Sequence, residues 1–220
     1  MYPIILGPSS LQQRRQRRLD LLVNLLSGRG PKPNCAKSPD CKTISVIIEL
    51  DTPGGKIGHT GIGIGNEYYD YGPINGAGLL CGYPGFQWWD RPGNDFPGRD
   101  PADIDLPDIE DMIHNNPKRF DFDILEVQWC MCKDNADKVE QYWKDLYKNI
   151  ADGNSENGPI YSIPGLQCTS SVCQSINRGR LLGSLSPETY LKQVVKKTNE
   201  CGENKGKKAF VKLLRHQSPK

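Results

Sequence analysis

Two residues of this 220-residue sequence combine the type and the setting that nucleophilic chemistry needs. Cys168 stands where a short helix is expected to begin, and the partial positive charge at a helix N-terminus favours the thiolate form of cysteine. A thiolate that attacks a carbonyl also needs an imidazole to take and return a proton. Of the three histidines, His59, His114 and His216, only His59 lies in an expected strand that would fix its ring. The sequence therefore predicts a Cys168–His59 pair.

A third polar group must orient the imidazole, and the expected hairpin that carries His59 offers two candidates. If the turn at Gly65 has two residues, Asp70 lies one diagonal step from His59 on the same face of the sheet. A three-residue loop would reverse the parity and present Tyr71 instead.

The neighbours of Cys168 suggest how a substrate is held. Thr169 and the two serines after it are small and polar, so we expect the first helical turn to be open to substrate and its backbone N–H groups to hold an oxyanion. Cys173 should face the core. Trp88, which precedes a second tryptophan, either lines a substrate groove or anchors its loop by burial.

Both strands and helices are expected to position these groups, which predicts an α+β fold with an antiparallel sheet packed against helices. Apolar alternation predicts strands over residues 43–50, from about 57 to 64, over 67–71 and over 122–132. Helical spacing and caps predict helices over 134–150, from about 168, and over 186–195. Residues 72–119 are rich in Gly, Pro and Asp and are expected to form a long irregular loop region. The glycines inside the HTGIGIG strand are expected to let substrate or the cysteine helix pack close to the sheet.

Three regions are expected along the chain. Residues 1–42 hold an amphipathic helix over 9–27 and a Pro/Gly/Lys-rich linker, residues 43–200 form the catalytic domain, and residues 201–220 form a basic C-terminal tail.

Composition limits the partners and cofactors. The net charge of +2 gives no global field that favours nucleic acid, although basic runs near both ends leave a membrane surface or nucleic acid open as partners. No apolar run is long enough to span a bilayer, and MYPIILGPSS is not a secretory signal. The eight cysteines lack the paired spacing of a zinc site, so we expect no metal and no cofactor. Cys35 and Cys41 flank a loop and can form a local disulfide.

Two stretches, "HTGIGIGNEYYDYGP" and the later "GLQCTSSVCQSI", resemble the circularly permuted papain-like hydrolases of the NlpC type. That family's motif is a His-x-Gly strand with alternating aliphatic residues, a polar residue on the next strand, and a cysteine opening a helix. The resemblance covers about residues 44–180 and implies a permuted papain-like fold with His59 as base, Asp70 as orienting residue and Cys168 as nucleophile. Gln167 stands where many relatives have Asn, and its side chain would help to polarise a carbonyl.

The resemblance implies a cysteine-dependent hydrolase, cleaving an amide bond such as that of a peptidoglycan peptide, as an antibacterial effector or toxin domain. Such toxins travel with a cognate immunity protein. The absence of a signal peptide agrees with export by a dedicated machine and action in the target-cell periplasm or envelope. Three alternatives stay open: a lipid acyl hydrolase or acyltransferase of the same fold, a nuclease-type toxin that uses the basic ends, and a binding module without catalysis.

Overall fold

The computed structural model describes residues 32–49, 59–69, 71–73, 81–82, 84–85, 124–151, 161–162, 168–177 and 186–214. The expected helix over 9–27, Asp70, Trp88 and Gln167 lie outside the described residues, as does most of the loop region over 72–119.

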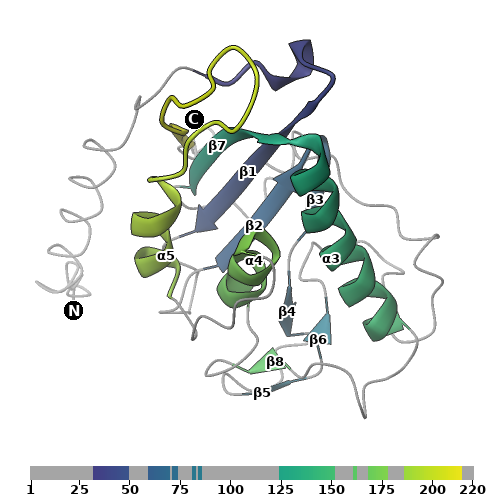
Figure 1. The fold of residues 1–220 in the computed structure, drawn as a ribbon. Helices are drawn as coiled ribbons and strands as arrows, with labels where there is room; N and C mark the ends of the chain where they lie inside the picture. Colours follow the sequence, from purple (N-terminus) through teal and green to yellow (C-terminus); the bar gives the residue numbers. More distant parts are fainter. Residues whose placement is uncertain are drawn as a thin grey trace, which may run out of the picture.

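A five-stranded antiparallel sheet organises the described residues (Figure 1). The strand order is β3-β2-β1-β7-β9, and the strands are β1 (Cys41–Glu49), β2 (His59–Ile64), β3 (Glu67–Tyr69), β7 (Ile124–Cys132) and β9 (Phe210–Leu214). Each strand of the predicted set therefore has a counterpart, and β9 is an addition. The α+β class with an antiparallel sheet is confirmed.

Strand alternation decides which face of the sheet is the core face. Across the central β1–β7 pair, Val46 lies opposite Val127 and Ile44 opposite Trp129, and all four side chains are buried. Because successive side chains point to opposite faces, this register places these four side chains on one face, the face of the hydrophobic core.

The β2–β3 hairpin has the predicted two-residue turn. Ile64 pairs with Glu67, and Gly65 in the turn has φ of +64°, a conformation that glycine adopts without steric cost. This register is the one on which the assignment of Asp70, rather than Tyr71, to the face of His59 depends.

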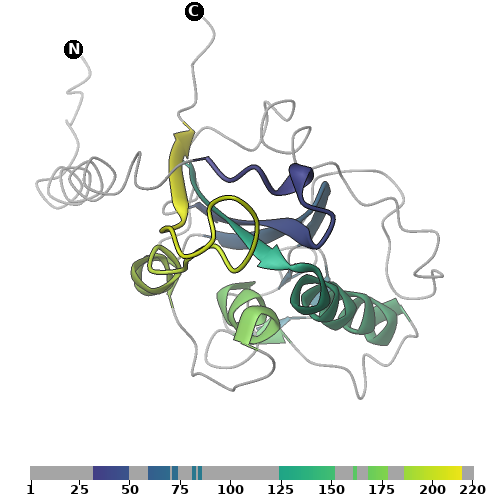
Figure 2. The same ribbon diagram turned by 45° about the horizontal axis from the view of Figure 1, so that its top comes forward.

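Three helices pack on the same side of the sheet: α3 (Lys133–Ala151), α4 (Cys168–Asn177) and α5 (Pro187–Val194) (Figure 2). The last begins as predicted, with Ser186 as the N-cap whose hydroxyl oxygen accepts the Thr189 N–H and proline at the first position. The described helices include none that is long and apolar enough to cross a membrane.

The core fills the space between these helices and the sheet. Its largest buried side chains include Trp129 of β7, Trp143 of α3 and Tyr69 of β3, and the rings of Tyr69 and Trp143 stack with centroids 5.9 Å apart. Val172 and Cys173 carry the apolar face of α4 into the same cluster, so the expectation that Cys173 lies in the core is confirmed.

The described parts of the loop region form short pairings. Strand β4 (Gly72–Pro73) pairs with β6 (Pro84–Gly85), and β5 (Cys81–Gly82) pairs with β8 (Tyr161–Ser162). A single 3-10 turn, η1 (Cys35–Lys37), precedes β1.

The C-terminal part differs from the expected basic tail. Phe210–Leu214 form β9, which pairs with β7 at the edge of the sheet, and Val211 is buried. The segment leading to β9 is also fixed, because the Asn199 side chain accepts the Cys130 N–H at 2.7 Å and donates to the Lys207 carbonyl at 3.1 Å. Residues 201–214 are therefore part of the folded unit.

Two disulfides join distant segments at this end of the sheet. Cys35 is bonded to Cys130 across a sequence separation of 95, and Cys41 is bonded to Cys201 across a separation of 160. The local Cys35–Cys41 bond considered from the sequence is therefore absent, because each sulfur meets a partner that the sheet brings to it. The bonds attach the segment before β1 and the segment before β9 to the central strands.

Gly61 leaves space for a side chain of the neighbouring strand, not for substrate or the cysteine helix. A Cβ at this position would lie 1.9 Å from the Tyr68 hydroxyl oxygen and 2.4 Å from its Cζ, so the glycine makes room for the Tyr68 ring. This is a diagonal cross-strand neighbour, since Tyr68 pairs with Gly63. The prediction that the strand glycines admit substrate or the cysteine helix is wrong for Gly61.

Replacing both Cys41 and Cys201 by serine is expected to lower the free energy of unfolding by about 2–5 kcal/mol, because the bond closes a long loop. Urea unfolding without reductant, followed by circular dichroism, measures the change. Cys132→Ser is the control, since Cys132 lies outside both disulfides, and it should change stability by less than about 1 kcal/mol. Equal stability of the double variant and the wild type would contradict the pairing.

Candidate functional site

His59 begins strand β2 and is almost fully buried, with 6% of its surface exposed. The strand is held on both sides, by β1 along its whole length and by β3 from Ile62 to Ile64. His59 itself pairs with Glu49 of β1, which limits its backbone freedom. The expectation that His59 lies in a strand is confirmed.

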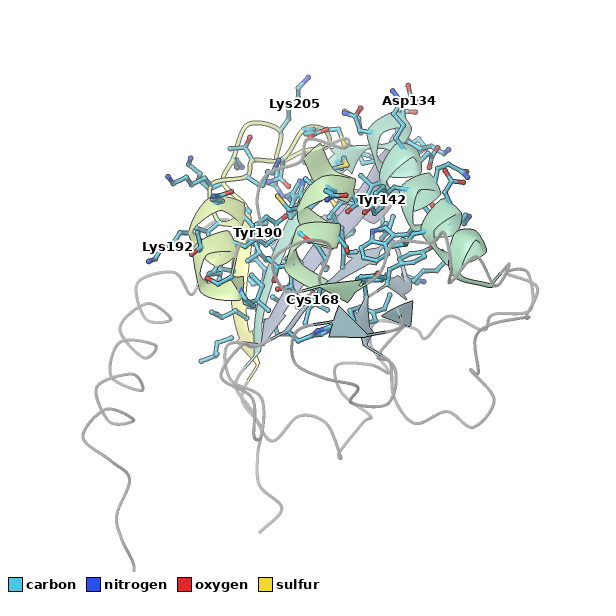
Figure 3. The ribbon with its side chains drawn as sticks, turned by 90° about the horizontal axis from the view of Figure 1, so that it is seen from below. Asp134, Tyr142, Cys168, Tyr190, Lys192 and Lys205 are labelled. Carbon is cyan, nitrogen blue, oxygen red and sulfur yellow. A yellow bond between two sulfur atoms is a disulfide. The ribbon has the colours of Figure 1, made fainter. Side chains whose placement is uncertain are left out.

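Cys168 is the first residue of α4, as predicted (Figure 3). Its side chain is 1% exposed, yet it does not belong to the hydrophobic cluster that holds Cys173 further along the same helix. The two cysteines of α4 thus differ in surroundings. Cys173 packs as a small apolar residue, whereas Cys168 lies among polar groups.

The polar groups around the Cys168 sulfur come from two elements. The His59 side chain and the Thr60 backbone N–H on β2 hydrogen-bond to it, and the Thr169 hydroxyl oxygen lies 3.8 Å from it. The chain thus brings residues 59 and 168 into direct contact, the juxtaposition that the chemistry requires.

Electrostatics at this contact favour the thiolate. Burial raises the pKa of Cys168, but the charge of His59 and the hydrogen bonds from His59, Thr60 and Thr169 lower it, and the net direction is below the ordinary value. Because the two groups interact this closely, the ionisation of Cys168 depends on the charge of His59. The lowered pKa favours the thiolate, which is the nucleophilic form of a cysteine.

A buried hydroxyl pair lies beside this contact. Oγ1 of Thr60 and Oγ1 of Thr169 are 3.0 Å apart, and both residues are 0% exposed. The hydrogen bond joins β2 to the first turn of α4, one residue after His59 and one residue after Cys168.

The other predicted site residues have different outcomes. Thr169 and the serines at 170 and 171 are buried, so the expectation of a first turn open to substrate is wrong: their small hydroxyl side chains pack against the fold. Tyr71, the alternative orienting group, is fully buried and belongs to the hydrophobic cluster. This agrees with the two-residue turn, which places Tyr71 on the face of the sheet opposite to that of His59. Asp70, Gln167 and Trp88 lie outside the described residues.

Sequence reasoning missed two positions. Thr60 takes the core-facing place that Ile62 and Ile64 take further along β2, and this break in the alternation was visible in HTGIGI. Glu49 is directly opposite His59 in the β1–β2 register, a position that only the pairing of the two strands reveals. This register makes Glu49 a second candidate acid for His59.

The burial of the pair has a chemical consequence. With 1% of Cys168 and 6% of His59 exposed, a substrate carbonyl can reach the sulfur only after groups that cover it have moved. Exclusion of water also strengthens the attraction between a thiolate and an imidazolium, because the effective dielectric constant falls.

Among the described residues, no group of three or more His, Cys, Asp and Glu side chains is arranged to hold a metal ion.

Comparisons with protein-family models, with curated proteins and with solved structures give no significant match to this chain. A thiolate, a proton-transferring imidazole and the backbone N–H groups of a helix start are the parts required for acyl transfer through a thioester.

Replacing His59 by alanine is expected to raise the pH midpoint of Cys168 ionisation by about one to three units, because the charge and a hydrogen bond that lower its pKa are both removed. Thiolate absorbance at 240 nm, recorded against pH with Cys168→Ser as the blank, reads this midpoint without requiring reagent access.

Cys132→Ser is the matched control. Cys132 is the last residue of β7, at the end of the sheet away from His59, so its loss should leave the Cys168 midpoint unchanged. An unaltered midpoint in His59→Ala would show that the imidazole does not act on the sulfur.

Proposed function

We propose that the chain is a cysteine-dependent hydrolase with a permuted papain-like fold, in which Cys168 is the nucleophile and His59 the proton carrier. The observation that carries this proposal is the contact between the Cys168 sulfur and the His59 side chain, with the thiolate favoured at that contact. Reactive centres are places where the pKa values of neighbouring groups are shifted, as the pKa of Cys168 is beside His59.

The proposed reaction follows from the groups present. The Cys168 thiolate forms a bond to the carbonyl carbon, and the carbonyl electron pair moves to oxygen, where backbone N–H groups of the first turn of α4 stabilise it. The tetrahedral intermediate collapses, the carbon–nitrogen bond breaks, and His59 gives its proton to the departing amine. His59 then takes a proton from water, which attacks the thioester and releases the carboxylic acid and the thiolate.

The elements that carry the two groups support this assignment, because both residues lie in regular secondary structure and not in loops. His59 begins a strand inside a five-stranded sheet, and Cys168 begins a helix that packs on that strand. Sites built on strands and helices hold reacting groups more accurately than sites built on loops. This arrangement suits a reaction in which a proton moves over a fixed short distance.

An amide bond, such as that of a peptidoglycan peptide, is the proposed target, and the biological role is that of an antibacterial effector with a cognate immunity protein. A lipid acyl ester is the second candidate, because the same thiolate chemistry cleaves it. A nuclease-type toxin would not need a reactive thiol, so the lowered pKa of Cys168 beside His59 favours the hydrolase. A binding module without catalysis would likewise have no use for a reactive thiolate.

The proposed place of action is an oxidising compartment, the target-cell periplasm or envelope, after export by a dedicated machine. The support is the pair of disulfides that attach both flanking segments to the sheet, since such bonds persist in oxidising compartments and are rare in the cytosol.

Expression of the chain in the cytoplasm and, with an added export signal, in the periplasm tests the proposal. We expect growth inhibition in the periplasm that is lost in Cys168→Ala and in His59→Ala, each of which removes one reacting group. Purified protein should then release fragments from muropeptides and leave liposomes intact, whereas the reverse result would assign the lipid reaction.

Cys132→Ser should keep the inhibition, because it removes a thiol away from the site. Melting temperatures of all variants separate lost chemistry from lost folding. Full inhibition by folded Cys168→Ala and His59→Ala would refute the hydrolase.

The orienting acid is proposed to be Asp70, with Glu49 as the competing position opposite His59. Asp70→Asn is expected to lower kcat by up to about 10⁴-fold, since an orienting carboxylate fixes the imidazole tautomer, whereas Glu49→Gln should cost less than about tenfold. Both values are measured on the substrate identified above. A larger loss in Glu49→Gln would transfer the role to Glu49.

A further inference from the structure

Thr60 and Thr169, called here the threonine pair, occupy matching positions in two apolar stripes. On β2, the core-facing positions are Ile64, Ile62 and then Thr60. On α4, Thr169 precedes Val172, Cys173 and Ile176 at helical spacings of three, four and seven residues. Each threonine is therefore the first member of a stripe that otherwise faces the core with apolar side chains.

A hydroxyl at such a position needs a reason. An unpaired buried hydroxyl is unfavourable because it has lost its hydrogen bonds to water, and an aliphatic residue would bury more apolar surface in the same place. The two hydroxyls satisfy one another across 3.0 Å, but two valines would avoid the cost altogether. The polar choice at both positions points to a role that an apolar pair could not supply.

The position of the sulfur supplies that role. Thr169 Oγ1 lies 3.0 Å from Thr60 Oγ1 on one side and 3.8 Å from Cys168 Sγ on the other. A hydroxyl has one proton to donate and two lone pairs to accept. When Cys168 is a thiolate, Thr169 donates its proton to the sulfur, and its oxygen accepts the proton of Thr60.

The three groups then form a directed chain of hydrogen bonds from Thr60 through Thr169 to the sulfur. Donation from Thr60 polarises the Thr169 hydroxyl and strengthens its bond to the negative sulfur, as hydrogen bonds in a chain reinforce one another at low dielectric. Thr60 also presents its backbone N–H to the same sulfur.

We propose that the threonine pair is a positioning device for the nucleophile, in which the Thr60 hydroxyl, without touching the sulfur, stabilises the Cys168 thiolate through Thr169. The same bond fixes the start of α4 against the start of β2, and so the separation of Cys168 and His59. The catalytic consequence rests on the proposed hydrolase function, whereas the ionisation of the thiol does not.

The test is the pH midpoint of thiolate absorbance at 240 nm, with Cys168→Ser as the blank. Thr169→Val removes the hydroxyl next to the sulfur and should raise the midpoint by about one unit. Thr60→Val keeps the backbone N–H and removes only the remote hydroxyl, so it should raise the midpoint by about half a unit. The double variant should shift no further than Thr169→Val alone, because the remote hydroxyl acts only through Thr169.

Serine variants provide the matched controls. Thr60→Ser and Thr169→Ser keep the hydroxyls while losing a methyl group, so they should lower the melting temperature but retain the wild-type midpoint. If a valine variant fails to fold, the comparison of Thr60→Ala with Thr60→Ser gives the same information.

An unchanged midpoint in folded Thr60→Val or Thr60→Ala would overturn the proposal and leave the pair a packing contact. Failure of the hydrolase function would give a different pattern, since the midpoints would shift as expected while no substrate is cleaved by the wild type.

Discussion

The contact between the Cys168 sulfur and the His59 imidazole is the interaction on which the proposed chemistry depends. A buried thiolate without a cation beside it would take up a proton, because burial alone raises its pKa. The charge and the hydrogen bond of His59 oppose that effect, and with the Thr60 N–H and the Thr169 hydroxyl they lower the pKa of Cys168 below its ordinary value. The fold therefore has to bring a strand start and a helix start together, so that these groups reach the buried sulfur.

The sheet and the disulfides meet this requirement from opposite ends. At the site, the start of β2 pairs with β1, and α4 packs on β2 through the threonine pair. At the other end of β1 and β7, two disulfides and the Asn199 hydrogen bonds attach the flanking segments. A reactive pair that must be buried needs such a rigid frame, because its attraction depends on a short and constant separation.

Features that depend on a few neighbouring residues could be predicted from the sequence. The two-residue turn at Gly65 and the start of α4 at Cys168 follow from turn chemistry and helix signals within a few residues, and both are confirmed. Burial of the first turn of α4 was missed, because hydroxyl side chains alone do not tell a wet surface from a satisfied interior. The hydroxyl of Thr169 has its partner on another element, 109 residues away.

Long-range pairings could not be predicted in the same way. The disulfide partners of Cys35 and Cys41 are set by where β7 and the segment before β9 pass, and cysteine spacing alone leaves many pairings open. The place of Glu49 opposite His59 depends on the β1–β2 register, and β9 was hidden because Lys205, Lys207 and Lys208 make its approach resemble a solvated tail. The pairing of Cys168 with His59 was readable from the sequence, whereas the groups around the pair needed the fold.

The most direct test is the separation between Cys168 Sγ and the nearer ring nitrogen of His59 in a crystal structure grown near neutral pH. The account predicts a separation within hydrogen-bonding reach, with Thr60 N and Thr169 Oγ1 also directed at the sulfur. A sulfur that faces only apolar side chains, or an imidazole turned away from it, would contradict the proposed chemistry.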